Sequence, residues 1–260
     1  MDYKKSIFVL GLFSLTSFSL SINASIEPSN IKETLLKKYA VTYENKTQLA
    51  DLKSLTLKNG KNSVEALVEV MKNGKYPDKN RWMATFMLGE IMGNKSAPFV
   101  SKFLRHPSWV MRMASLKTLL GLKEKQYATE YTYLLNDDSL LVRTQALENI
   151  RLLKIEKSAP QVWSMLYDKK NYSEPTINGK QLKHKRTNII KNAILTIGEL
   201  KFEKARSTLF TMIQKSRYED IFPELDTALS NITGVKSPDS DIKTKRLFWQ
   251  RNALSNTVIE

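Results

Sequence analysis

One pattern recurs three times along the chain at a fixed spacing of 31 residues. It is an arginine close to the start of an apolar stretch, in NRWMATFMLGEIM (80–92), VMRMASLKTLLGL (110–122) and LVRTQALENIRLL (141–153). The three arginines are Arg81, Arg112 and Arg143. A repeat of this length indicates a unit that cannot bury its own apolar face and must stack on its neighbours.

The positions that follow each arginine predict one face of a helix. The third position after the arginine is always small, and the seventh and tenth are large and apolar. This spacing places all three positions on one side of a helix, and the small residue lets a neighbouring helix come close. A polar turn and a second apolar helix follow each copy, at 96–104, 126–135 and 158–166.

The pattern continues after an interruption. Ile190–Leu200 matches the third copy at a spacing of 47, and Leu225–Val235 follows 35 residues later, with Ile190 and Leu225 in place of the arginine. The 16 additional residues lie within 168–187. Tyr43–Lys72 is interpreted as a degenerate first copy.

These features predict an all-α fold. The chain has only 9 glycines among 260 residues, and no segment shows the alternation of a half-buried strand. We expect an α-solenoid, a right-handed superhelix of about five to six stacked helix pairs. The expected organisation is N-terminal helices at 25–75, repeats at 76–235 with the insertion at 168–187, and a C-terminal cap at 236–260.

The first 24 residues have the layout of a secretory signal peptide. Lys4 and Lys5 precede the apolar stretch 7–20, and a small residue, Ala24, stands at the expected cleavage point. A membrane anchor is the alternative, but the stretch is rich in serine and shorter than the ~20 residues of a spanning helix. The chain has no cysteine, which excludes disulfides and a lipid-modified cysteine. The prediction is an exported protein, periplasmic or secreted.

The formal net charge is +15, with 41 basic and 26 acidic residues. Removing residues 1–24 takes away two lysines and one aspartate, which leaves +14. Such an excess favours an acidic partner or an anionic surface. A lysine-rich, solvated surface is the other interpretation, because most of the excess is lysine, which is less suited than arginine to bidentate recognition.

The repeats resemble the HEAT-repeat family, in particular the short bacterial type described as phycobilisome-lyase-like. Val142-Arg143 with Ala146 matches the valine–arginine and alanine core of those repeats, and a turn, NDDS (136–139), precedes it. The tail, 231–254, resembles the end of some bacterial HEAT-repeat proteins, with a threonine–glycine turn followed by Trp249. The resemblance implies a stack of helix pairs, and it says little about function.

Motifs of catalysis are missing from the sequence. There is no HExxH, glycine-rich phosphate loop, nucleophile elbow or CxxC, and the two histidines, His106 and His184, lie far apart. Asp137-Asp138 is interpreted as a helix-capping turn and not as an acid/base or metal site. The prediction is a protein that is not an enzyme and has no cofactor and no metal.

Three groups of residues are candidates for binding or for structure. The repeat arginines Arg81, Arg112 and Arg143 either line an anion-binding groove or bond the turn of their own or the preceding repeat, which is favoured because turn carbonyls and Asp78 or Asp138 are within reach. Candidates for binding protein or anions are a basic cluster in the insertion and two tryptophans at non-core positions of the repeats. They are Lys180, Lys183, Lys185, Arg186, Trp82 and Trp109.

The favoured functional hypothesis is an exported scaffold that binds a partner protein along a concave face made of the second helices. A polyanion-binding module, for nucleic acid or an anionic envelope polymer or lipid, is the alternative and would use the basic insertion. A HEAT-like DNA glycosylase is a further alternative only if the N-terminus is not a signal peptide. A bilin lyase is suggested by nothing beyond the name of the repeat type.

Overall fold

The computed structural model describes residues 28–172, 176–177, 180–181 and 188–256. Most of these residues are helical, which confirms the all-α prediction. The predicted signal peptide lies outside the described residues. None of the described helices has the length and apolar character needed to cross a membrane.

The elements follow one another with short connections. The α-helices are α1 (Pro28–Tyr39), α2 (Lys46–Asn59), α3 (Val64–Lys72), α4 (Asp78–Met92), α5 (Ala97–Val100), α6 (Trp109–Gly121), α7 (Ala128–Leu134), α8 (Leu140–Leu152), α9 (Ala159–Ser164), α10 (Asn188–Glu199), α11 (Arg206–Ile213), α12 (Phe222–Thr233) and α13 (Ile242–Asn256). The 3-10 helices are η1 (Gly60–Ser63), η2 (Gly93–Ser96), η3 (Ser101–Arg105), η4 (Lys125–Tyr127), η5 (Glu156–Ser158), η6 (Lys169–Tyr172), η7 (Glu203–Ala205) and η8 (Ser216–Ile221). Two strands, β1 (Thr176–Ile177) and β2 (Lys180–Gln181), pair antiparallel within the insertion.

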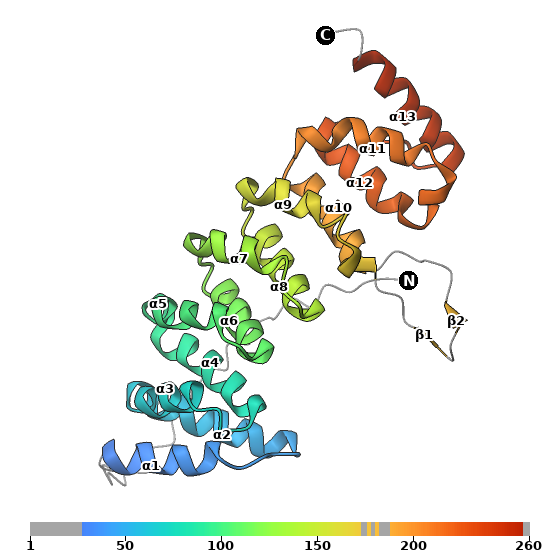
Figure 1. Cartoon of the computed structure of the whole chain (residues 1–260). Coiled ribbons are helices and arrows are strands. Elements are labelled where there is room, and N and C mark those ends of the chain that lie inside the picture. The colour runs from blue at the N-terminus through green and yellow to red at the C-terminus, as the bar shows by residue number, and fades with distance from the viewer. Residues whose placement is uncertain (1–27, 173–175, 178–179, 182–187, 257–260) are drawn as a thin grey trace.

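The helices form an elongated stack (Figure 1). The first helices of the repeats, α4, α6, α8, α10 and α12, each contact the next along the stack, and α2 contacts α4. The shorter second helices α5, α7 and α9 lie along the other side. In the predicted degenerate copy, α2, η1 and α3 have the same order of first helix, 3-10 turn and second helix as α4, η2 and α5.

Most of the positions predicted to face the core are buried. All five small residues at the third position after the arginine site have no exposed surface. Ser115 is the polar one among them, and it donates its hydroxyl to the Val100 carbonyl. Close approach of first helices is clearest at Gly198, where an added Cβ would lie 2.5 Å from the Cα of Ala228. The five buried small residues are Ala84, Ser115, Ala146, Ala193 and Ala228.

The ends of three first helices repeat the same backbone conformation. Lys123, Lys154 and Lys201 have φ of 57°, 51° and 51°, in the left-handed region. After each of them, an N–H reaches five residues back to the carbonyl at the buried seventh position, as in Ile155 to Ile150 at 3.0 Å. The lysines are spaced 31 and 47 residues apart, which is the spacing of the sequence repeat.

The C-terminal helix α13 covers the last repeat. It packs on α11, and Trp249 has no exposed surface. The indole Nε1 donates to Asp226 Oδ1 at 2.7 Å, and Lys245 Nζ lies 2.8 Å from Oδ2. Three predicted core positions differ. Ile91 and Leu122 are only partly buried. Val235 is 41 % exposed, because α12 ends at Thr233 and Gly234 adopts φ 75°.

Candidate functional site

Arg143 is a buried arginine whose donors serve two turns. The side chain is 3 % exposed, and Nη1 donates to the carbonyls of Asp137 and Asp138 in the turn before its own helix, at 2.7 and 3.1 Å. Nε donates to Asn171 Oδ1 at 2.9 Å and Nη2 to the Lys170 carbonyl at 3.1 Å, both in the turn after α9. One side chain therefore holds two successive turns together.

Arg112 repeats this arrangement one unit earlier. Its Nη1 donates to the carbonyls of His106 and Pro107 in its own turn, both at 2.8 Å. Its Nε and Nη2 form a bidentate pair with Asp137 of the following turn, at 2.7 and 2.8 Å. Asp137 also accepts the N–H of Ser139 at 2.9 Å, which closes the turn while the carboxylate binds Arg112. Ser139 is the N-cap residue of α8 and no side chain caps the helix there, so the predicted helix cap is not made.

Arg81 makes the corresponding link at the first repeat. Nη1 lies 3.3 Å from Asp78, as expected from the sequence, and Nη2 donates to the Met71 carbonyl at 3.0 Å. The partner in the following turn is the imidazole of His106, whose Nε2 lies 3.3 Å from Nη2. Sequence reasoning named the arginine's own and preceding turns but missed the following turn, which lies 25 to 28 residues ahead in each case.

The repeat arginines therefore form an internal row of links between successive units. Arg81 and Arg143 are almost completely buried, and most of their donors are occupied by protein acceptors. This geometry supports the structural interpretation of the row. In the fourth and fifth copies Ile190 and Leu225 are buried in the same register, so apolar packing replaces the link there.

His106 predicts a pH dependence of stability. Burial lowers the pKa of the imidazole below its usual range, and the charges of Arg81 and Arg112 act in the same direction, although a backbone hydrogen bond with Ser108 and the charge of Asp78 oppose them. The unfolded chain then binds a proton more readily than the folded chain as the pH falls through about 6.5. The contribution of His106 to the free energy of unfolding is therefore fully present above that pH. It is lost as the pH falls towards the lowered pKa of the folded state.

We expect the free energy of unfolding of the wild type to fall between pH 7 and pH 5 more steeply than that of His106→Gln, measured by urea denaturation across the range. The effect is small because the ring is only half-buried. The second histidine, His184, is unchanged in the variant, so the difference between the two slopes reports His106 alone. Equal slopes would contradict the expectation.

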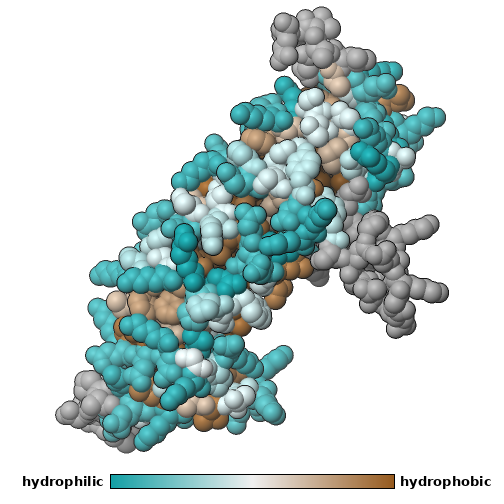
Figure 2. Space-filling view, viewed as in Figure 1, coloured by the Kyte–Doolittle hydropathy of each residue, from teal (hydrophilic) through white to brown (hydrophobic). Residues whose placement is uncertain are grey.

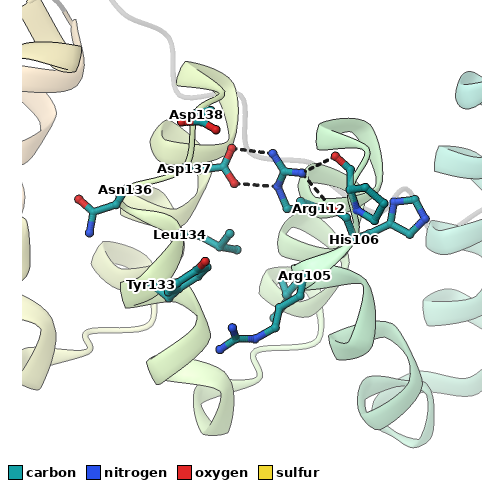
Figure 3. Close-up of a pocket in the computed structure, with 10 residues that line it drawn as sticks. Arg105, His106, Arg112, Tyr133, Leu134, Asn136, Asp137 and Asp138 are labelled. Carbon is teal, nitrogen blue, oxygen red and sulfur yellow. Dashed lines mark hydrogen bonds and ion pairs between the residues drawn. The ribbon is translucent and has the colours of Figure 1, made fainter.

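A pocket of about 480 Å³ opens beside the Arg112–Asp137 pair (Figure 3). The Arg105 guanidinium lies 4.7 Å from the ring centroid of Tyr133 at its mouth, and Tyr133 is 60 % exposed. The two carboxylates and two arginines that line the pocket balance in charge, and the deepest pair, Arg112 with Asp137, is already satisfied.

A second, more apolar groove of about 400 Å³ lies across the first helices α2, α4 and α6. Trp82 lies in its wall, half-buried, with its ring stacked on Phe86 at 5.9 Å. The groove is lined by Leu49, Lys79, Trp82, Met83 and Val110. Of these five residues, only Trp82 is a candidate from the sequence. The other four were missed because the repeat pattern indicates which positions are buried, and it does not indicate which exposed positions on different helices lie side by side.

The outer face of the first helices has further exposed apolar residues. Trp109 is 43 % exposed at the start of α6, and Leu140 and Leu141 are 45 % and 52 % exposed at the start of α8. Trp109 and Leu140 each stand three residues before a repeat arginine, so successive units place them in the same register. Figure 2 shows, on one face of the molecule, hydrophobic patches set among a mostly hydrophilic surface.

The basic cluster of the insertion is only partly described. Lys180 lies in β2, paired with Ile177 of β1. Lys183, Lys185 and Arg186 lie outside the described residues. Among the described residues there is no group of three or more histidine, aspartate or glutamate side chains that could hold a metal ion.

Comparisons with known proteins were made by family model and by similarity to curated proteins. No family model and no curated protein matches the chain.

Proposed function

We propose that the chain is an exported α-solenoid of HEAT-like repeats that binds a partner protein and has no catalytic activity. The exposed apolar face of the first helices, around Trp82 and Trp109, is the proposed binding surface. The sequence had suggested the second helices, and the groove beside Trp82 is the observation that moves the proposal to the first helices.

The stacking of the helices supports a rigid scaffold. Successive first helices contact one another, and the arginine row links each turn to the next through buried hydrogen bonds. Each link fixes the position of one unit relative to its neighbour, because a guanidinium bonded on two sides cannot shift without losing several bonds. A surface spread over several units then keeps its shape, as binding by a repeat protein requires.

The composition of the first-helix face supports binding to protein. Tryptophan is enriched among the residues that dominate protein interfaces, and large apolar side chains gathered on one surface are a mark of interaction sites. A polyanion-binding function remains the second candidate, favoured by the net charge of +15. The two differ in salt dependence, because binding to phosphates weakens steeply with salt and apolar contact does not.

The test is a pull-down from source-cell envelope extract with the chain from Ser25 to Glu260, which contains every described residue. We expect a defined protein to remain bound at ~0.5 M salt, where surface charge interactions are strongly screened. Trp82→Ala combined with Trp109→Ala should release it, with a loss of at least ~2 kcal/mol of binding energy.

The control variant is Tyr167→Ala, which removes an exposed aromatic ring from the side of the second helices. It should leave the capture unchanged. Retention of nucleic acid or lipid alone, with release at high salt, would contradict the protein-binding proposal and favour the polyanion function. Loss of capture with Tyr167→Ala but not with the tryptophan variants would place the surface on the second helices.

A further inference from the structure

We propose that the groove across α2, α4 and α6 binds an acidic amphipathic helix of a partner protein, with an apolar side chain of that helix seated against Trp82. This inference rests on the proposed function and adds the chemistry of the partner.

The groove provides an apolar seat of suitable size. Its volume of about 400 Å³ is lined by four apolar side chains contributed by three helices. Trp82 and Met83 come from α4 in the middle, with Leu49 of α2 on one side and Val110 of α6 on the other. An amphipathic helix recognises such a groove by placing side chains from successive turns into it.

Two basic side chains border the groove. Lys79 is the charged residue of the lining, and Lys117 of α6 places its Nζ 5.8 Å from the ring centroid of Trp82. Both lysines are exposed. Within the described part of the chain, neither has a carboxylate at salt-bridge distance; the Nζ of Lys79 lies 3.4 Å from the Tyr43 carbonyl.

The nearby carboxylates on the same helix already have partners. Asp78 lies 3.3 Å from Arg81, and Glu90, further along α4, lies 3.7 Å from Lys53 of α2. The groove therefore presents apolar surface together with two lysines that lack an acidic partner. Its complement is a helix with apolar residues on one face and glutamate or aspartate at the borders of that face.

The experiment measures binding of labelled synthetic helices to the chain from Ser25 to Glu260 by fluorescence anisotropy. The probe is an amphipathic helix with leucine and one tryptophan on one face and glutamate on the other. Two comparison peptides are the same helix with lysine in place of glutamate, and a poly-glutamate of equal length. We expect the acidic helix to bind at least ~10-fold more tightly than either comparison peptide.

Four variants locate the site. Trp82→Ala should weaken binding at least ~10-fold, while Tyr167→Ala, which removes an exposed aromatic ring on the side of the second helices, should change it less than ~2-fold. The double variant Lys79→Glu/Lys117→Glu should weaken binding of the acidic helix and strengthen binding of the basic one. The matched control is Lys102→Glu/Lys125→Glu, which makes the same change of charge at exposed lysines of η3 and η4.

Each outcome decides between specific alternatives. Equal binding of the acidic and basic helices, or equal effects of the two double variants, would overturn the assignment of an acidic partner at this groove. Poly-glutamate bound as tightly as the helix would show attraction to charge alone. The lysine variants alter exposed side chains and keep the test valid if Trp82→Ala perturbs folding. One further outcome separates this inference from the proposed function. In that outcome the wild type captures a protein partner that the tryptophan variants do not capture, and yet has no affinity for the acidic helix. That result would support the proposed function and reject this inference.

Discussion

Replacing Arg143 with alanine is expected to lower the free energy of unfolding by at least about 3 kcal/mol. The change removes four hydrogen bonds and leaves the carbonyls of Asp137, Asp138 and Lys170 and the side-chain oxygen of Asn171 without their donor. An unsatisfied buried polar group costs about 1–3 kcal/mol, and water entering the vacated space recovers part of that cost. Urea denaturation followed by circular dichroism measures the loss.

Arg151→Ala is the matched control for this prediction because it removes an arginine from the same helix. Arg151 pairs with Glu199 at 3.2 Å, and the two side chains are 32 % and 41 % exposed. An exposed pair contributes about 0–1 kcal/mol, so this variant should remain close to the wild type. Equal stability of the two variants would show that the arginine row does not hold the units together.

The loss of stability caused by Arg143→Ala should also be local. Arg143 joins the turn before α8 to the turn after α9, so its loss should raise amide hydrogen exchange in α8 and in residues 169–172 before it affects α2 and α4. Arg143→Lys should recover little stability, because an ammonium group cannot reach both turns as the planar guanidinium does.

The repeat pattern was predictable because it reports burial directly. Ala146 and Ile150 lie three and seven residues after Arg143, and both are completely buried, since a unit that stacks on two neighbours must present the same face in every copy. The insertion also follows from the spacing of 47 residues, and the cap from Trp249. The all-helical fold needed no more information than this.

The long-range partners were not predictable by the same reasoning. The repeat shows that Arg112 recurs, but not that its carboxylate partner would be Asp137 of the following turn, because that choice depends on how far one unit is rotated and shifted on the next. In the same way, Leu49, Trp82 and Val110 come from three helices, and only the packing of those helices brings them to one groove. Registers within one helix can be read from a sequence; distances between helices cannot.

Trp249→Ala is expected to have the other large effect, a loss of about 3–5 kcal/mol. The indole projects from α13 and is completely buried, with its ring centroid 6.0 Å from that of Phe210 in α11 and 4.9 Å from that of Phe248 in α13. Alanine leaves a large cavity and removes the N–H donor of Asp226. Thermal unfolding followed by circular dichroism measures the change.

Two further variants separate packing from hydrogen bonding at this position. Trp249→Phe keeps most of the apolar volume but removes the bond to Asp226, whose carboxylate retains Lys245 at 2.8 Å; we expect a loss of about 1–3 kcal/mol. Trp109→Ala, at a 43 % exposed tryptophan, should cost less than about 1 kcal/mol.

If α13 seals the last repeat, Trp249→Ala should also make residues 234–241 more sensitive to protease than either of the other variants does, because the helix leaves α11 and frees the connection that precedes it. Unchanged protease sensitivity with a normal melting temperature would show that the stack is complete without α13.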